Sequence, residues 1–302
     1  MAAAGEKDVW FITGCSSGIG AALAKHIYDA GCSIIATARK PDTLAYLPDE
    51  PNVLKLALDI TDPDQVAHVV KAGVERFGRL DVVVNNAGYG LTADSENVPD
   101  AEARAQLETN FWGAVSVTKA ALPVLRETNP VGKGGLIIQI SSVGGRVCFP
   151  GKFALEGYTE ALAKEMHPDW NIKFLIIQLG SFKTKFADNI HLVARHPAYR
   201  DPKCGYNQLA AYFENQAESS KHWTDPAACA KVLYEVASTR NQSPLPVRLS
   251  LGADAHSLIQ LELEKALREH EDWKSVARST TSGSGFDAVE IVSSISKGSA
   301  AS

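Results

Sequence analysis

The sequence predicts an α/β fold of the doubly wound kind, in which helices cover both faces of a parallel sheet. The first observation is that short apolar runs alternate with stretches of helical periodicity over residues 9–273. The second is that these runs, such as 136–140, are almost continuously apolar, which is typical of strands buried on both faces. The third is a glycine-rich turn at residues 13–20, between the first apolar run and the first helix-forming stretch.

The expected elements follow one another in regular order. Strands are expected at residues 9–12, 32–38, 53–58, 80–84, 136–140, 172–178 and 247–249, and helices at 21–27, 63–77, 101–126, 152–166, 226–238 and 254–273. With 302 residues, of which 45% are hydrophobic, the chain can bury the core of one domain, which we place at residues 1–278. Residues 279–302 are rich in Ser and Gly, and we expect them to form a disordered tail.

Residues 183–224 depart from this alternation. A stretch of this length inside a compact domain is usually functional or mobile. It contains Pro197 and Pro202 and the aromatic residues Tyr199, Tyr206, Tyr212, Phe213 and Trp223. We interpret it as a helical segment that covers the substrate. The alternative is a small helical subdomain that its own aromatic side chains hold together.

Composition excludes several classes of partner. The formal net charge of −5 provides no basic field of the kind that attracts nucleic acid or an anionic membrane. The five cysteines lack the spacing of a metal site or of a disulfide framework, so we expect reduced thiols and no metal. No apolar run is long enough to span a bilayer, and residues 1–7 contain no apolar signal core. We therefore expect a cytoplasmic protein with no nucleic-acid partner and no membrane span.

The glycine-rich turn predicts a nucleotide site. Gly14, Gly18 and Gly20 have no Cβ, so the backbone can approach a ligand closely and adopt a positive φ. The free N–H groups at the start of the following helix can then bind a pyrophosphate. The alternative is an ordinary tight turn, but the strand before it and the helix after it favour a dinucleotide site.

The end of the second strand predicts which dinucleotide is bound. In such folds an acidic residue at this point accepts a hydrogen bond from the ribose 2′-hydroxyl of NAD, whereas a nearby Arg accommodates the 2′-phosphate of NADP. This chain has Arg39 and Lys40 there, and the next acidic residue is Asp42. An Arg-Lys pair is also common on any protein surface, but its position here favours NADP.

Several motifs, in this order, resemble the classical short-chain dehydrogenase/reductase family. They are Thr13-Gly14-x-x-x-Gly18-x-Gly20, Asp59 after the third strand, Asn85-Asn86-Ala87-Gly88, Asn110 in the long helix and Ser142 after the fifth strand. Cys15-Ser16-Ser17 and Lys152-Phe153-Ala154-Leu155-Glu156-Gly157 are most similar to the 17β-hydroxysteroid and retinol dehydrogenase-like branch. The resemblance implies a Rossmann-like fold and the NADP-dependent interconversion of a hydroxyl and a carbonyl on a hydrophobic small-molecule substrate.

The resemblance also assigns residues to the cofactor. Asp59 and Ile60 would meet the adenine ring, and Thr184 the nicotinamide carboxamide, although Leu179 stands where the family usually has a proline. The residues expected to bind NADP are Gly14, Ser16, Ser17, Gly18, Ile19, Gly20, Thr37, Arg39, Asp59, Ile60, Asn86, Gly88, Lys152 and Thr184.

The expected catalytic residues are Asn110, Ser142 and Lys152. The resemblance implies that Ser142 hydrogen-bonds the substrate oxygen and that Asn110 holds a water in a proton relay. Lys152 would bind the nicotinamide ribose and lower the pKa of a catalytic tyrosine. Relatives commonly dimerise through the two long helices that contain Asn110 and Lys152. The resemblance therefore implies that this chain can form a homodimer.

The catalytic tyrosine is missing from its expected place. The family has a Tyr four residues before the lysine, where this chain has Cys148, and Ser142 precedes Lys152 by several residues fewer than in the family. A short deletion explains both departures, either as a true variant or through a mistaken splice boundary. Pro150 and Gly151 separate Cys148 from Lys152, so these two side chains are not expected to share a helix face. Tyr158, six residues after Lys152, is expected to pack in the core.

Three hypotheses follow. The first is an active NADP-dependent oxidoreductase. The second is an NADP-binding protein that is catalytically impaired or inactive, because a phenol with a suitably lowered pKa is the proton donor that this chemistry needs. The third is a chain whose shortened helix leaves a hole beside the nicotinamide.

Overall fold

A seven-stranded parallel sheet forms the centre of the protein. The computed structural model describes residues 7–147, 150–186, 189–201, 203–204, 207 and 215–280. The strands lie in the order β3-β2-β1-β4-β6-β7-β9. They are β1 (Val9–Ile12), β2 (Ser33–Ala38), β3 (Val53–Ala57), β4 (Val82–Asn85), β6 (Gly135–Ser142), β7 (Ile172–Leu179) and β9 (Arg248–Leu251). The order reverses between β1 and β4, and in such sheets ligands bind beyond the carboxyl ends of the strands at this point.

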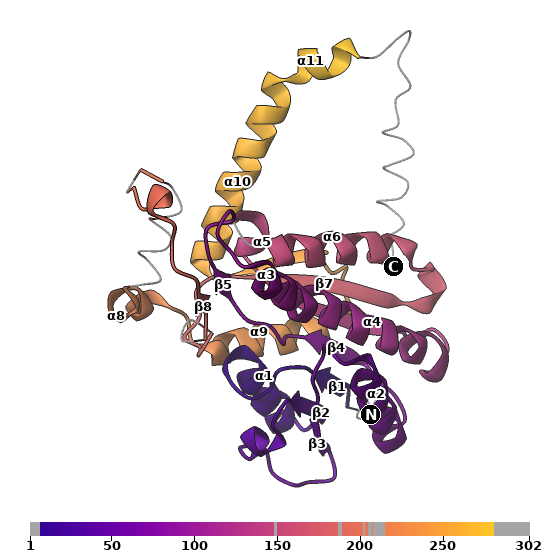
Figure 1. Cartoon of the computed structure of the whole chain (residues 1–302). Helices are drawn as coiled ribbons and strands as arrows, with labels where there is room; N and C mark the ends of the chain where they lie inside the picture. Colours follow the sequence, from indigo (N-terminus) through magenta and orange to yellow (C-terminus); the bar gives the residue numbers. More distant parts are fainter. Residues whose placement is uncertain are drawn as a thin grey trace.

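Helices cover both faces of the sheet (Figure 1). They are α1 (Gly18–Asp29), α2 (Pro63–Phe77), α3 (Asp100–Leu107), α4 (Ala114–Pro123), α5 (Gly144–Val147), α6 (Pro150–Glu165), α8 (Gln216–Ser219), α9 (Pro226–Ser238), α10 (Ala253–Asp272) and α11 (Lys274–Ser279). Helices α1 and α9 pack on one face, and α2, α4 and α6 pack on the other. The prediction of a doubly wound, single-domain α/β fold is confirmed.

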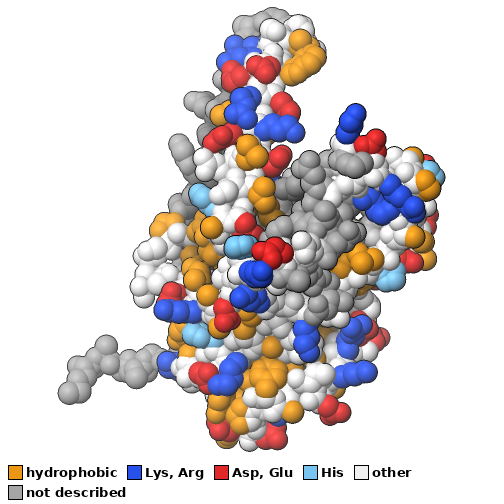
Figure 2. All heavy atoms as spheres, turned by 90° about the vertical axis from the view of Figure 1, so that its left-hand side faces the viewer, with side chains coloured by type: hydrophobic (Ala, Val, Ile, Leu, Met, Phe, Trp, Pro, Cys, Tyr) orange, Lys and Arg blue, Asp and Glu red, His pale blue; other side chains and the backbone are white. Residues whose placement is uncertain are grey.

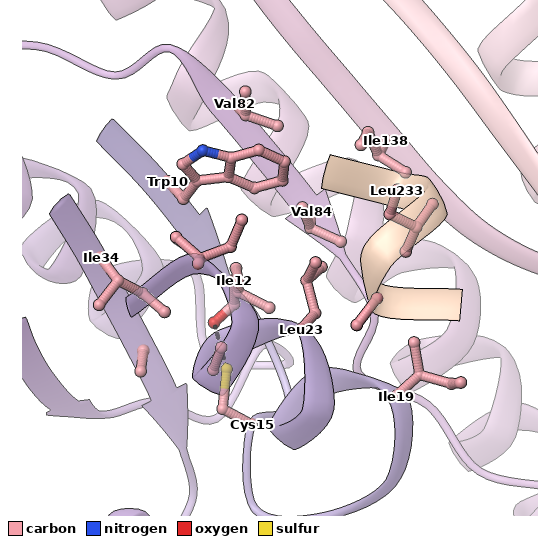
Figure 3. Close-up of a cluster of buried hydrophobic side chains, with 14 of the residues drawn as sticks. Trp10, Ile12, Cys15, Ile19, Leu23, Ile34, Val82, Val84, Ile138 and Leu233 are labelled. Carbon is pink, nitrogen blue, oxygen red and sulfur yellow. Dashed lines mark hydrogen bonds between the residues drawn. The ribbon is translucent and has the colours of Figure 1, made fainter. Parts of the chain in front are cut away.

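Successive residues of the strands supply two separate cores. Trp10 and Ile12 of β1 pack toward α1 and α9, whereas Val9 and Phe11 pack toward α2 and α4. Figure 3 shows part of the first core, where Leu23 of α1 lies close to residues of the sheet. This two-sided burial explains why the predicted strands read as continuous apolar runs.

The long helix expected at 101–126 is present but irregular. A π-type turn, η2 (Glu108–Gly113), separates α3 from α4, and a second, η3 (Val124–Thr128), follows α4. Gly113 permits the first turn to pack against the chain after β3, because a Cβ there would lie 2.7 Å from Ile60 Cδ1. The turn contains Asn110, one of the expected site residues.

The last helix is longer than expected and is broken near Trp273 into α10 and α11. The two helices project from the body, with hydrophobic, basic and acidic side chains mixed on their surface (Figures 1 and 2). Since α11 ends at Ser279, the helical region slightly overlaps the predicted tail, and residues 281–302 lie outside the described part of the chain. None of the described helices combines the length and apolarity needed to cross a membrane.

Residues 183–224 leave the sheet and return to it at neighbouring points, because Phe182 and Thr224 form a β-bridge. Within this excursion β8 (His191–Leu192) pairs in parallel with β5 (Leu91–Thr92), outside the main sheet. The buried carboxylate of Asp94 accepts hydrogen bonds from Arg195 Nε and from the His196 backbone at 2.9 Å. The excursion is therefore fastened to the chain that follows β4. Pro202, Tyr206, Tyr212 and Phe213 lie outside the described residues.

Candidate active site

The glycine-rich turn connects β1 to α1 and is held in a conformation that needs glycine. Gly14 and Gly18 have φ values of 72° and 60°, in the left-handed region. A Cβ on Gly20 would lie 2.3 Å from the Gly14 carbonyl oxygen, so α1 approaches the turn as closely as a backbone can. Ser17 precedes α1 in an extended conformation, and its side chain does not cap the helix. These features fit a diphosphate, because the first N–H groups of α1 are not bonded by a capping side chain.

The chain after β4 braces this turn from the side. Asn86 donates its side-chain amide to the carbonyl oxygens of Thr13 and Gly14, at 2.9 and 3.1 Å. The buried Thr13 hydroxyl accepts hydrogen bonds from the backbone N–H groups of Asn86 and Ala87, at 3.0 and 3.1 Å. The amide of Asn86 thus stabilises the turn itself. The sequence predicted only that Asn86 lines the nucleotide cleft. Thr13 was not among the expected site residues, although it directly precedes the first glycine.

A cleft of about 800 Å³ opens beside the turn. Thr184 stands across from α1, where a Cβ on Gly18 would lie 3.2 Å from Thr184 Cβ. The cleft therefore lies between the expected diphosphate site and Thr184, at the expected nicotinamide site. Three lysines line it, of which Lys221 forms an ion pair with Glu218. Its lining residues are Ser16, Ser17, Gly18, Lys183, Thr184, Lys185, Ser220, Lys221, Trp223 and Pro226.

Arg39 and Thr37, both expected to bind the cofactor, differ in how far they are exposed. Arg39 is exposed and directly follows β2, where no described residue forms an ion pair with it. Thr37, by contrast, is buried and donates its hydroxyl to the Ile12 carbonyl at 3.0 Å. Its own carbonyl accepts a hydrogen bond from Cys15 N at 2.8 Å. The hydroxyl of Thr37 is thus bonded to the end of β1, and its backbone carbonyl holds Cys15 of the glycine turn.

Asp59 and Ile60 lie at the carboxyl end of β3. Asp59 Oδ1 accepts hydrogen bonds from Thr61 N and Thr61 Oγ1, at 3.0 and 2.7 Å. This arrangement fixes the carboxylate beside the sheet edge. Ile60 is buried against Gly113.

Three of the expected site residues meet beyond β4. A Cβ on Gly88 would lie 2.9 Å from Asn110 Oδ1 and 3.8 Å from Lys152 Nζ. Asn110 is buried, and its side-chain amide forms two hydrogen bonds with the backbone of Tyr89, donating to the carbonyl at 2.8 Å and accepting from the N–H at 3.0 Å. The Asn110 side chain therefore clamps the loop after β4. Tyr89 was not expected at the site, and no sequence pattern indicates this clamp.

Lys152 is the third residue of α6, and its ammonium group donates to the Ile140 carbonyl of β6 at 2.7 Å. Burial lowers the pKa of Lys152 from 10.5 to about 8, and the negative charge of Glu156 opposes this shift. Ser142 ends β6, two residues after Ile140. Its hydroxyl donates to the Leu179 carbonyl at 3.3 Å and accepts from Gly144 N at 3.2 Å.

No tyrosine stands one helical turn before Lys152. Cys148, at that position in the sequence, lies outside the described residues. Tyr158 packs edge-on against Phe111, with ring centroids 6.0 Å apart. This contact agrees with the prediction that Tyr158 has a packing role. A Tyr-x-x-x-Lys spacing does occur elsewhere in the sequence, at Tyr199 and Lys203. Tyr199 lies in the excursion and not on α6, and its hydroxyl donates to Glu96.

Comparison with known proteins identifies the family. Residues 8–192 match the family model described as short chain dehydrogenase. The chain belongs to the short-chain dehydrogenase family. Among relatives of this family, oxidoreductase calM of Penicillium decumbens is 44% identical over 87% of this chain and 89% of its own length.

Solved structures of family members share the fold. A short-chain dehydrogenase from Streptomyces avermitilis superimposes with a TM-score of 0.78 at 32% identity, covering 92% of this chain and 100% of its own. An alcohol dehydrogenase from Thermococcus sibiricus, complexed with 5-hydroxy-NADP, has a TM-score of 0.62 at 25% identity, covering 82% of this chain and 96% of its own. The family and the Rossmann-like fold are therefore established, and the chain is a member of an oxidoreductase family.

Proposed function

We propose that this short-chain dehydrogenase is an NADP-dependent oxidoreductase that interconverts a hydroxyl and a carbonyl group on a small, hydrophobic substrate. The observation that carries the proposal is the meeting of Gly88, Asn110 and Lys152 beyond β4, with Asn110 Oδ1 and Lys152 Nζ 2.9 and 3.8 Å from where a Gly88 Cβ would be. The cluster adjoins the glycine turn, because Asn86, two residues before Gly88, is bonded to Gly14.

In this proposal the first N–H groups of α1 bind the diphosphate of NADP. Asp59 and Ile60 border the adenine, while Gly88 and Thr184 border the nicotinamide. The bound cofactor would supply or accept the hydride. The ammonium group of Lys152 binds the ribose hydroxyls, for which it must leave or share the Ile140 carbonyl.

Arg39 supports NADP over NAD. It is exposed at the end of β2, and no acidic residue precedes Asp42 there, so the 2′-phosphate would meet a guanidinium and not a carboxylate. The similarity to the Thermococcus enzyme, which was solved with an NADP derivative, points the same way.

The Ser142 hydroxyl is proposed to orient the substrate oxygen. Its hydrogen bond to the Leu179 carbonyl is 3.3 Å long, and a hydroxyl can rotate toward a better partner. The site adjoins the excursion at residues 183–224, which we propose covers the substrate.

A second candidate, an NADP-binding protein with little or no turnover, is favoured by one observation. Cys148 occupies the sequence position at which the family has its tyrosine, so the chain lacks the usual proton donor. General acid–base catalysis contributes about 10²–10⁴-fold to a rate. Losing this donor would reduce turnover by such a factor and leave cofactor binding intact.

Homodimerisation is part of the proposal. Trp112 in η2 and Phe153 in α6 are 54% and 47% exposed, on the two helical segments that relatives use as an interface. Burying two large apolar side chains from each copy would favour association. The cytoplasmic location stays a prediction from the sequence.

The test is to measure NADPH binding and NADPH-dependent reduction of a panel of aliphatic and aromatic ketones on the purified chain. Turnover by the chain as it stands supports the first candidate. Binding without turnover, with activity restored by inserting a Tyr-bearing segment between Gly151 and Lys152, supports the second. Absence of NADPH binding contradicts both.

A further inference from the structure

Glu156 lies on α6 one helical turn after Lys152, and its carboxylate is buried, with the side chain 3% exposed. A buried carboxylate is costly unless hydrogen bonds and opposite charge compensate it. Here four donor contacts surround it. Oε1 accepts from Ser141 Oγ at 2.7 Å and from Gln178 Nε2 at 3.2 Å, and Oε2 accepts from Gln178 Nε2 at 2.9 Å and from Arg248 Nε at 3.0 Å.

These donors belong to three different strands. Ser141 and Gln178 lie next to the carboxyl ends of β6 and β7, and Arg248 is the first residue of β9. Ser141 directly precedes Ser142. The carboxylate of Glu156 therefore ties α6 to the sheet on the side where Ser142 and the glycine turn lie.

Lys152 needs such an anchor because it is close to the end of its helix. In the described part of the chain helix α6 starts at Pro150, two residues before Lys152. Helix ends fray, and the first residues of a helix lack the backbone hydrogen bonds that fix its interior. The long Lys152 side chain donates a hydrogen bond to the Ile140 carbonyl of β6. Contacts made by Glu156, on the next turn of α6, would keep the Lys152 backbone at a constant distance from Ile140.

The charges around the carboxylate also favour this role. Arg248 faces it from β9, and Arg146 Nε of α5 lies 4.0 Å from Oε2. Arg248 is shared with Glu160, one turn further along α6. On its own helix Glu156 faces Lys152, whose charged form it favours.

We propose that Glu156 is the positioning residue of the site, whose buried carboxylate holds the first turns of α6 on the sheet so that the Lys152 ammonium group stays beside Gly88 and Asn110. The consequence for NADP binding rests on the proposed function, whereas the effect on Lys152 itself does not. Glu156 touches neither the substrate nor the cofactor in this scheme.

The test compares E156Q with E160Q. Both replace a carboxylate of α6 that contacts Arg248, but Glu160 is two turns from Lys152 and more exposed. Competitive trace acetylation of the cofactor-free protein, read by peptide mass spectrometry from pH 6 to 11, reports the midpoint and the maximal rate of labelling at Lys152. We expect E156Q to lower the midpoint by about one pH unit, because a charge one turn away is removed, and E160Q to leave it unchanged.

A second variant separates positioning from charge. S141A removes one donor from the carboxylate and changes no charge, and it also serves if E156Q does not fold. We expect S141A to raise the maximal labelling rate of Lys152 about twofold or more, because Nζ is held less firmly at Ile140. Equal midpoints in wild type and E156Q, or an unchanged maximal rate in S141A, would overturn the proposal. NADPH titration of the same proteins is read separately. If wild type binds no NADPH, the proposed function fails and the labelling result still decides the role of Glu156.

Discussion

A Cβ on Gly20 would lie 2.3 Å from the carbonyl oxygen of Gly14, so these two residues can form the nucleotide turn only if residue 20 is glycine. We predict that Gly20→Ala pushes α1 away from the turn and costs about 1–3 kcal/mol of unfolding free energy, the usual range for overpacking. NADPH binding should be lost, because the N–H groups of α1 no longer face the ligand. Urea unfolding and NADPH fluorescence measure the two effects.

Gly157→Ala is the matched control for this change. Gly157 is in α6, and a Cβ there would have no neighbour within 4 Å. Alanine is the better helix former by about 0.8–1 kcal/mol, so this variant should be more stable and bind NADPH normally. Normal NADPH binding by the Gly20→Ala variant would refute the assigned geometry.

Arg39→Asp tests the preference for NADP. A hydrogen bond to a charged group is worth about 1.5–3 kcal/mol, which corresponds to a loss of at least about tenfold in NADPH affinity. NADH has no 2′-phosphate, so its affinity should change by less than about threefold or improve. Lys40→Asp places the same charge one residue further and should have the smaller effect. Equal losses for both dinucleotides would exclude a contact between Arg39 and the 2′-phosphate.

Thr13→Val tests the brace between β4 and the turn. The variant keeps the shape of the side chain but leaves the N–H group of Ala87 without its buried acceptor and the N–H group of Asn86 with the Val84 carbonyl as its remaining acceptor, which should cost about 1–3 kcal/mol. Thr159→Val is the control. Thr159 is also fully buried, but its hydroxyl donates to Leu155 O within α6, so its loss leaves no N–H unpaired. If urea unfolding gives the same loss for both variants, the brace contributes nothing particular.

Lys152 should make stability depend on pH. Burial lowers its pKa from 10.5 to about 8, so between these values the unfolded chain binds more protons than the folded one. The penalty for burying the ammonium group is complete below pH 8 and is relieved as the pH rises toward 10.5. Lys152→Met removes it, so the variant should be more stable than wild type at pH 7, by at most about 3 kcal/mol. The difference, measured by urea unfolding, should shrink toward pH 10.5. A constant difference would show that Lys152 titrates normally.

Much of the fold follows from local patterns. The strand runs are apolar on both faces, so their positions can be predicted to within one or two residues, and the parallel arrangement then gathers Gly14, Asn86 and Ser142 at one edge. The π-type turn at Asn110 was not predictable, because an apolar spacing that suits an α-helix does not reveal one additional residue in a turn.

Side-chain direction limited the prediction of the site. Thr37 lies where a cofactor contact was expected, yet its hydroxyl turns inward to Ile12 because the buried turn needs a donor there. The hydrogen bond between Glu156 and Arg248 joins residues 92 positions apart, and only the completed sheet brings them together.

In the proposed function this short-chain dehydrogenase binds NADP through the glycine turn, and Arg39 selects the phosphorylated form. Calorimetric titration of the purified chain with NADPH and with NADH tests both parts of this proposal. We expect one NADPH per chain, bound at least about tenfold more tightly than NADH, as expected for a charge-assisted contact. Binding of neither dinucleotide, or tighter binding of NADH, would contradict it.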